Sequence, residues 1–198
     1  MPSDLHATKL IPDIASNDGF VSYVKNLLSK KIFRQSLKED GKFQGAKFYN
    51  FGDSSIGYYA LVDDAGELVY FVRYKAVKAN NLKFGRQVLV WREKTNASSA
   101  GFAEFVFFSK LLPRFKALIT DTQQTNNGRQ FWQHVLRQSF GKESCRVYFL
   151  DRRSSPNTLT ELLSYEEVIK YEPKIWGSDE GHLRTHAVIS TTPLKIAS

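Results

Sequence analysis

The sequence has very few of the residues that form cross-links and metal cages. It contains one cysteine, Cys145, which excludes an intramolecular disulfide and a cysteine-based metal site. We expect Cys145 to be a small core residue. Only 4 histidines are present. Two of them, His182 and His186, are four residues apart in an expected strand, where that spacing separates them by about 13 Å. No third ligand is evident, so we expect no metal site.

The chain also lacks a long apolar run. No segment approaches the roughly 20 apolar residues that a membrane-spanning helix needs. Residues 1–20 do not have the basic and then apolar pattern of a secretory signal peptide. We therefore expect a cytoplasmic protein without a membrane partner. A chain of 198 residues with 42% hydrophobic residues is long enough for one domain with its own core.

Acidic residues are fewer than basic ones. The chain has 20 Asp and Glu against 28 Lys and Arg, a formal net charge of +8, which favours anionic partners. Residues 68–92 contain no acid at all. The basic residues there are Arg73, Lys75, Lys78, Lys83, Arg86 and Arg92, interleaved with Tyr70, Phe71, Tyr74 and Trp91. Two interpretations stay open: a solvated basic hairpin, or a surface for nucleic acid or a phosphorylated cofactor.

The first half of the chain predicts a helix followed by strands. Capping residues at 16–18 and apolar residues at three- and four-residue spacing predict a helix over about 18–31, preceded by an arm over 1–17. Polar, glycine-containing sequence follows. Residues 56–77 form the clearest hairpin, with two β-branched and aromatic runs around the turn "DDAGE". A third strand follows, so we expect three sequential antiparallel strands.

The second half alternates between helices and strands. Residues 98–115 predict a buried helix that Pro113 ends or kinks. Strands are expected in "KALIT", "CRVYFLDRR" and "HLRTHAVIST", and a helix in "GRQFWQHVLRQSF". Thr158 and Glu161 have the spacing of a capping box and predict a further helix. Antiparallel strands followed by this alternation predict an α/β (α+β) fold with a mixed, mostly antiparallel sheet.

The junction after the strand at 117–120 supports a more specific interpretation. Its sequence, "ITDTQQTNNGRQFWQHVL", resembles phage-type members of the GCN5-related N-acetyltransferase (GNAT) family at Asp121, Thr125, Gly128 and Trp132. The order of elements over roughly 18–190 is similar to that family as well. The resemblance implies a single GNAT-like domain over 18–198, helices on both faces of the sheet, and acetyl transfer from acetyl-CoA to an amine acceptor.

The resemblance also implies where the cofactor binds. In the family the fourth and fifth strands splay apart, and the pyrophosphate lies on the N-terminus of the helix after the fourth strand, where free N–H groups favour an anion. Here that segment follows "WREKT" and departs from the family's glycine pattern. The cofactor-binding candidates are Arg92, Lys94, Asn96, Ser98, Ser99 and Gly101, with a second group at Asp121, Thr125, Asn127 and Gly128. Residues 125–128 also have a simpler explanation as a helix cap.

Two residues are candidates for catalysis. The resemblance implies that Glu93, at the end of the equivalent of the fourth strand, is the general base. Val135 stands where the family often has a tyrosine, so Tyr148 on the next strand is the candidate general acid. The alternative for Glu93 is a surface carboxylate. Arg152 and Arg153, which follow an apolar strand, either hold a phosphate or pair with acids.

A second function stays open at this point. The chain could instead be a non-catalytic, phage-encoded GNAT-like protein that works in the host cytoplasm and binds a host protein or nucleic acid through residues 73–92. The absence of the family's tyrosine and glycines favours this alternative. Steep weakening of binding by salt would be its signature.

Overall fold

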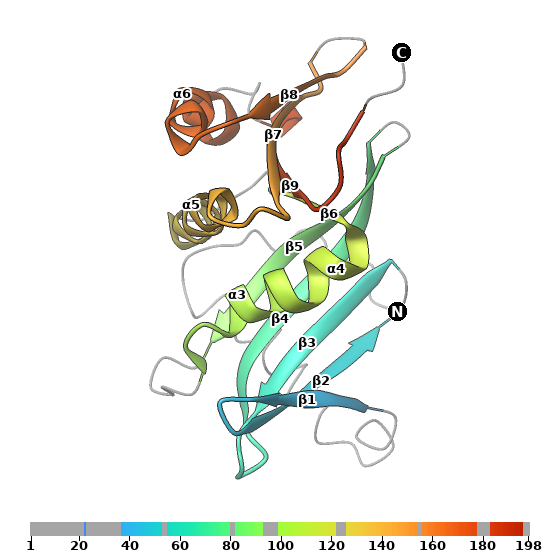
Figure 1. Ribbon diagram of the computed structural model, residues 1–198. Helices are drawn as coiled ribbons and strands as arrows, with labels where there is room; N and C mark the ends of the chain where they lie inside the picture. The colour runs from blue at the N-terminus through green and yellow to red at the C-terminus, as the bar shows by residue number, and fades with distance from the viewer. Residues whose placement is uncertain are drawn as a thin grey trace. The chain divides into compact units, whose positions relative to one another are not determined.

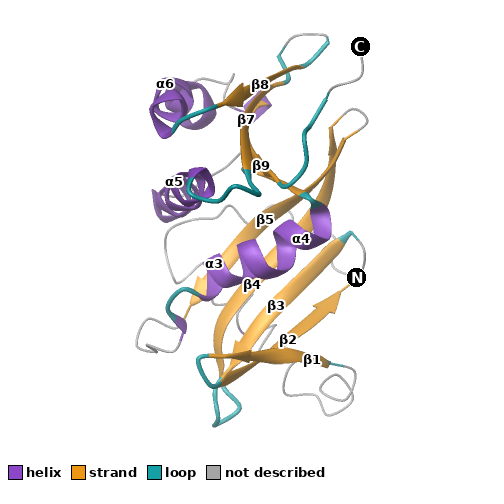
Figure 2. Ribbon diagram, viewed as in Figure 1, coloured by secondary structure: helices purple, strands orange, loops and turns teal. Residues whose placement is uncertain are grey.

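The protein has a mixed α/β fold (Figure 1; Figure 2). The computed structural model describes residue 22 and residues 37–52, 55–79, 82–92, 99–121, 126–153, 156–177 and 183–195. The expected arm over 1–17 and helix over 18–31 lie outside these ranges, apart from Ser22, which is helical. The chain forms two compact units, Met1–Tyr74 with Val88–Val106, and Lys75–Gln87 with Phe107–Ser198.

Nine strands form one mostly antiparallel sheet in the order β1-β2-β3-β4-β5-β6-β9-β7-β8. Of the pairings whose direction is known, only that of β5 with β6 is parallel. The mixed, mostly antiparallel sheet that the sequence predicts is confirmed. The strands are β1 Lys38–Phe43, β2 Ala46–Gly52, β3 Ile56–Val62, β4 Leu68–Ala79, β5 Leu82–Arg92, β6 Ala117–Ile119, β7 Arg146–Asp151, β8 Thr158–Leu162 and β9 Thr185–Ser190.

The three strands predicted after residue 55 are present as β3, β4 and β5. The turn between β3 and β4 also follows the sequence. The Gly66 amide donates to the Asp63 carbonyl at 3.0 Å, and the Glu67 amide donates to the Asp63 carboxylate at 2.9 Å. Gly66 has a φ of +83°, a conformation that favours glycine. The turn chemistry therefore sets the start of β4.

The hairpin of β1 and β2 is not in the sequence prediction, which treats this segment as polar loop. β1 carries charged side chains and has an irregular register between Glu39 and Gly41. Gly41 has a φ of +139°, outside the usual strand region. A bulged, polar edge strand has no clean alternation of apolar and polar residues, so its periodicity is invisible. Pairing with β2, whose Phe48 is fully buried, holds it in place.

The helix predicted over 98–115 is present over 102–115, in three parts. These are α3 Phe102–Val106, a π-helical turn η3 Phe107–Leu111, and α4 Leu112–Phe115. Pro113 lies two residues after the π-helical turn, as the second residue of α4. Proline cannot donate the backbone hydrogen bond of an α-helix, and a wider turn before it accommodates this loss. The helix ends at Phe115, and Lys116 takes a left-handed conformation that closes it.

The remaining helices are α5 Asn126–Phe140 and α6 Tyr165–Trp176. The prediction that a helix starts at Thr158 with a capping box to Glu161 is wrong. That segment is β8, which pairs antiparallel with β7. The helix cap lies six residues later: the N-cap Ser164 accepts from the Glu167 amide, and the Glu167 carboxylate accepts from the amide of the preceding residue, Leu163, at 2.6 Å, a variant of the capping box.

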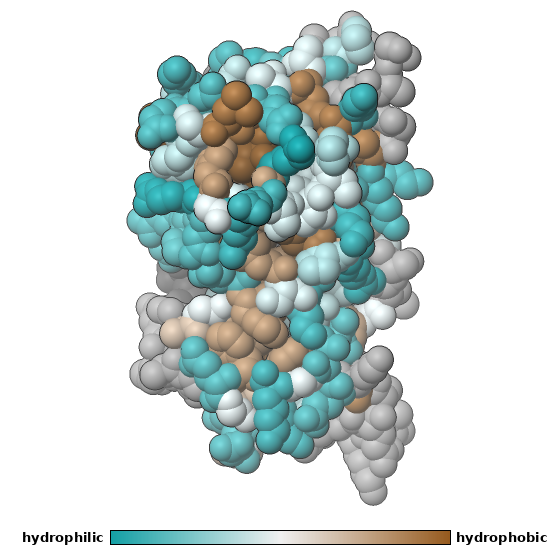
Figure 3. Space-filling model, in the orientation of Figure 1, coloured by the Kyte–Doolittle hydropathy of each residue, from teal (hydrophilic) through white to brown (hydrophobic). Residues whose placement is uncertain are grey.

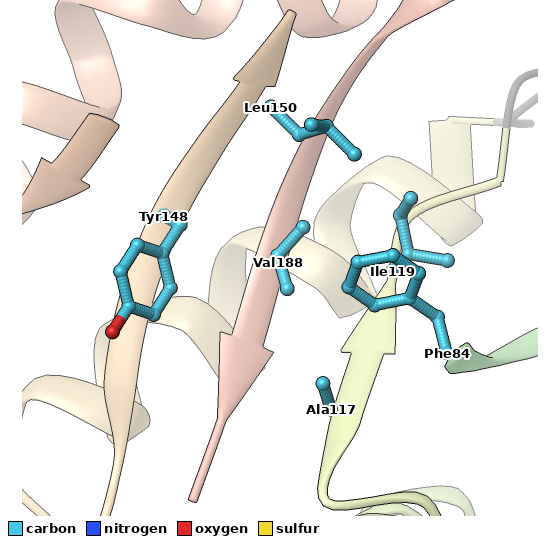
Figure 4. Packing of buried hydrophobic residues seen from close by; sticks show 6 residues of the cluster. All are labelled: Phe84, Ala117, Ile119, Tyr148, Leu150 and Val188. Carbon is cyan, nitrogen blue, oxygen red and sulfur yellow. The ribbon is translucent and has the colours of Figure 1, made fainter. Parts of the chain in front are cut away.

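One hydrophobic cluster spans four strands of the second unit, β5, β6, β9 and β7 (Figure 4). It consists of Phe84, Ala117, Ile119, Tyr148, Leu150 and Val188.

Figure 3 shows apolar side chains among hydrophilic ones in the region of α6 and β8, where Leu163 and Ile169 are exposed. No helix in the described part of the chain is long and apolar enough to cross a membrane.

Candidate functional site

The parallel contact between β5 and β6 is the most unusual feature of the sheet. It has a single recorded residue pair, Gly85 with Leu118, although β5 has 11 residues. β6 has only 3 residues and pairs on its other side with β9. Two parallel neighbours bring their carboxyl ends to the same edge of a sheet, which is where ligands bind in open α/β sheets. This edge is therefore the place to look for a site.

Gly85 is required at this contact for steric reasons. A Cβ atom there would lie 2.4 Å from Cδ2 of Phe115 and 2.6 Å from Cδ2 of Leu118. Both approaches are closer than van der Waals contact allows. Glycine inside a strand often marks such a close approach. The absence of a side chain at this position therefore lets the end of α4 and the start of β6 pack directly on β5.

The next residue, Arg86, is a buried cation. Its side chain is only 8% exposed, and its Nη1 atom lies 3.6 Å from a carboxylate oxygen of Asp121, which is 17% exposed. Burial lowers the pKa of Arg86, and the charge of Asp121 opposes that effect. The Nε atom of Arg86 has no hydrogen-bond partner among the described residues. A buried charge with incomplete pairing is costly, so this arrangement needs an explanation.

His186 adds a second buried polar group. The residue is fully buried on β9, where it pairs across the strands with Leu150 of β7. Within the described part of the chain neither ring nitrogen has a hydrogen bond of good geometry, and a weaker contact with the backbone of Thr120 lies beside the ring. Burial, with the charges of Arg86 and Arg152, lowers the pKa of His186 to about 3, opposed by the backbone of Thr120. The ring is therefore neutral at physiological pH.

Backbone hydrogen bonds fix the strand ends around these side chains. The Thr120 amide donates to the Ala187 carbonyl at 3.0 Å, and the Ala187 amide donates to the Thr120 hydroxyl at 3.1 Å. On the other side of β9, the Arg152 amide donates to the Arg184 carbonyl at 2.9 Å. The edge that carries Asp121 and Arg152 is thus held on both sides of β9.

We name these four residues, Arg86, Asp121, Arg152 and His186, the edge cluster. They come from β5, from β9, and from the residues that follow β6 and β7. All four belong to the second compact unit. Exposure increases from His186 through Arg86 and Asp121 to Arg152, which is an exposed residue. The cluster therefore runs from the core to the surface.

The structure brings one predicted cofactor residue, Asp121, into this cluster. Asn127 and Gly128 lie in the first turn of α5. Gly101, with a φ of +77°, precedes α3 and accepts from the Phe105 amide at 2.9 Å, while Ser99 is buried. These assignments stay predictions. The backbone of Arg92 ends β5. The other predicted residues, Glu93, Lys94, Asn96, Ser98 and Thr125, lie outside the described ranges.

The candidate general acid, Tyr148, lies in the hydrophobic cluster (Figure 4). Its hydroxyl accepts a hydrogen bond from the Leu194 amide at 3.3 Å. The hydroxyl keeps its own proton available for donation, because a phenol both donates and accepts. Its catalytic role stays a prediction.

Sequence reasoning noted the members of the edge cluster separately and did not connect them. It placed Arg86 in a basic stretch, Arg152 as a phosphate ligand or ion-pair partner, and His186 as an unsupported metal ligand. Arg153, which follows Arg152, pairs with Asp151 through three hydrogen bonds between side chains, at 2.9, 3.1 and 2.5 Å, and a fourth from its own amide at 2.9 Å. The signal available in the sequence was a polar side chain inside an apolar strand, Arg86 in one strand and His186 in another.

Comparisons with known proteins add little to the site geometry described above. No family model and no curated protein matches the chain. One similar solved structure is a GCN5-related glucosamine N-acetyltransferase region of a fungal multi-domain GH3 beta-N-acetylglucosaminidase. The likeness covers 69% of this chain and 17% of that one, at 12% identity and a TM-score of 0.34. We therefore base the function on the strand order and the site.

Proposed function

We propose that the protein is a GNAT-like acyltransferase that transfers an acetyl group from acetyl-CoA to an amine acceptor. The observation that supports this most directly is the parallel pair of β5 and β6 in an otherwise antiparallel surrounding. The chain connects the two strands through the helix over 102–115. The resemblance at the β6–α5 junction predicts this order of strand, helix, strand and helix.

The parallel pair has a chemical consequence. Where a strand of 11 residues lies beside one of 3, backbone groups of the longer strand continue past the end of its neighbour. An acyl-CoA can use such groups as hydrogen-bond partners, as the family's splayed strands do. The resemblance assigns the pyrophosphate to the N-terminus of the helix that follows the equivalent of the fourth strand.

The roles of individual residues belong to the same proposal. Arg92, Lys94, Asn96, Ser98, Ser99 and Gly101 bind the pyrophosphate. Asp121, Thr125, Asn127 and Gly128 line the junction before α5. Glu93 removes a proton from the acceptor amine, and Tyr148 returns one to the departing thiolate of CoA. The phage-type origin, the cytoplasmic location and the coverage of both sheet faces by helices are also part of this proposal.

Calorimetric titration of the full-length protein with acetyl-CoA tests the binding step. We expect saturable binding at one site, with a dissociation constant below about 1 mM. Release of free CoA thiol in the presence of an amine panel then tests turnover. Glu93→Gln should slow thiol release and leave acetyl-CoA affinity unchanged. No heat of binding at ligand concentrations of about 1 mM would exclude the proposal.

The non-catalytic alternative receives less support. Stacking on nucleic-acid bases needs accessible aromatic rings. In the basic stretch Tyr70, Phe71 and Tyr74 are all buried, with exposed fractions of 7%, 1% and 1%. Tyr74 instead packs on Tyr59, with its hydroxyl 3.4 Å from the Asn50 side-chain oxygen. These three rings therefore serve the core and do not support base stacking by the nucleic-acid form of the alternative.

A further inference from the structure

The edge cluster contains more donor capacity than its own residues use. An arginine side chain carries five N–H donors, and a neutral histidine carries one. Arg86 has one carboxylate contact at 3.6 Å, which is longer than the usual 2.7–2.9 Å of a charge-assisted hydrogen bond. Its buried Nε atom has no partner among the residues that the structure describes, and in the same residues the His186 ring has no side-chain partner and only a weak contact with the backbone of Thr120. The cluster is thus built for more contacts than it makes internally.

A purely structural ion pair in the same unit looks different. Arg153 lies two residues after Asp151, the last residue of β7, and the two share four hydrogen bonds, three of them between side chains. In that pair both carboxylate oxygens accept from the guanidinium group. Arg86 is more deeply buried than Arg153 and has fewer contacts, which is the reverse of what stability alone requires, because an unsatisfied buried donor costs free energy. Arg86 is therefore better explained by a ligand than by packing.

The charges of the cluster identify the ligand as an anion. Arg86 and Arg152 each carry a positive charge, Asp121 carries one negative charge, and His186 is neutral. Leu150 is opposite His186 and the Arg152 amide bonds to the Arg184 carbonyl, so Arg152 and His186 lie on the same face of the β7–β9 pair, and the charges of Arg86 and Arg152 both act on the His186 ring. A metal ion would be repelled by the two guanidinium groups. A carboxylate or a phosphate can accept from both arginines and from a ring N–H at once.

We propose that Arg86, Arg152 and His186 bind one anionic group, a carboxylate or a phosphate, that belongs to the amine acceptor. The assignment to the acceptor rests on the proposed acyltransferase function. Arg152, the exposed member, meets the anion first, and Arg86 and His186 hold it below the surface. Asp121 keeps Arg86 in position and lies beside the anion, where its carboxylate suits the ammonium group of the same acceptor. The substrate class is therefore an amine that also carries an acid group.

Titration of the full-length protein with inorganic phosphate and, separately, with acetate tests the site at constant ionic strength. We expect saturable binding of at least one anion, and the tighter one identifies the acid group of the acceptor. Arg152→Gln should weaken that binding by about tenfold, the loss expected for one charged hydrogen bond. Arg152 is exposed, so this substitution should leave the fold intact. His186→Leu should weaken binding as well.

Arg146→Gln is the matched control. Arg146 is an exposed arginine at the other end of β7 and pairs with Glu161 at 2.8 Å, so its removal changes the net charge equally. Its anion affinity should equal that of the unmodified protein. Equal weakening in both variants, or no saturable binding of either anion, would overturn the anion site. Displacement of phosphate by acetyl-CoA would overturn its assignment to the acceptor. Anion binding without acetyl-CoA binding would instead exclude the acyltransferase and retain the site.

Discussion

At the scale of single residues, His186 links stability to pH. Its pKa is about 3 in the folded protein, against about 6.5 in an unfolded chain, so the unfolded state binds the proton more strongly. The contribution of the neutral ring is complete above pH 6.5 and is lost as the pH falls towards 3. Between pH 6.5 and 5 the free energy of unfolding should fall by as much as about 1.4 kcal/mol per pH unit from this residue.

Urea denaturation at pH 7.5, 6 and 5 measures this dependence, and His186→Leu provides the comparison. Leucine fills a similar volume without a titratable group or unsatisfied nitrogens. The variant should lose most of the slope above pH 5 and should gain about 1 kcal/mol of stability at pH 7.5. A gain in stability together with a loss of anion binding is expected only of a residue retained for a ligand. A slope that persists in the variant would show that other groups cause it.

At the scale of the elements, the contact of β5 with α4 and β6 depends on Gly85. Gly85→Ala inserts a methyl group 2.4 Å from a ring carbon of Phe115, so the strand or the helix end must shift. We expect a loss of about 1–3 kcal/mol in the free energy of unfolding, and weaker acetyl-CoA binding because the parallel pair moves. Chemical denaturation and calorimetry measure the two effects.

Gly141→Ala is the control for this substitution. Gly141 follows α5, and a Cβ there would lie 3.5 Å from the nearest atom, an ordinary contact. Its stability should change by less than about 0.5 kcal/mol. If Gly85→Ala is equally mild, α4 and β6 tolerate displacement, and the close approach has no role in holding the sheet edge.

The start of α6 gives a second test at this scale. The Ser164 hydroxyl accepts from the Glu167 amide, so Ser164→Ala should reduce stability by about 1 kcal/mol. Thr158→Ala is the matched variant, because Thr158 has the same capping-box spacing to Glu161 but lies in β8. It should be close to neutral on thermal denaturation. A larger effect at Thr158 than at Ser164 would contradict the observed start of the helix.

These two positions show why the sequence predicts some elements and not others. Both Thr158 and Ser164 have an acid three residues on, and local chemistry cannot choose between them. The choice comes from pairing of β8 with β7, which lies several residues earlier in the chain. The strands β3, β4 and β7 are predictable because their apolar runs are long. The polar edge strand β1 is not, because pairing with its neighbour outweighs propensity.

The candidate site also depends on strand pairing that local sequence does not reveal. The junction at Asp121 is visible in the sequence because small polar residues follow an apolar strand there. Its partner Arg86 is not recognisable, because the contact depends on which two strands become parallel neighbours. His186 carries no local signal of its environment either. Residue types were readable from the sequence, whereas their grouping required the order of strands in the sheet.

At the scale of the whole molecule, the formal net charge of +8 attracts any polyanion, so the proposed acyltransferase function has to be distinguished from nucleic-acid binding by experiment. If charge alone acts, binding of a labelled single-stranded oligonucleotide should weaken by at least about tenfold between roughly 50 and 200 mM salt. Fluorescence anisotropy measures this. Lys78→Gln, in the basic stretch, and Lys42→Gln, on β1, remove exposed charges and should have similar small effects. Binding that survives the higher salt, or a loss confined to Lys78→Gln, would instead indicate a dedicated nucleic-acid surface on β4.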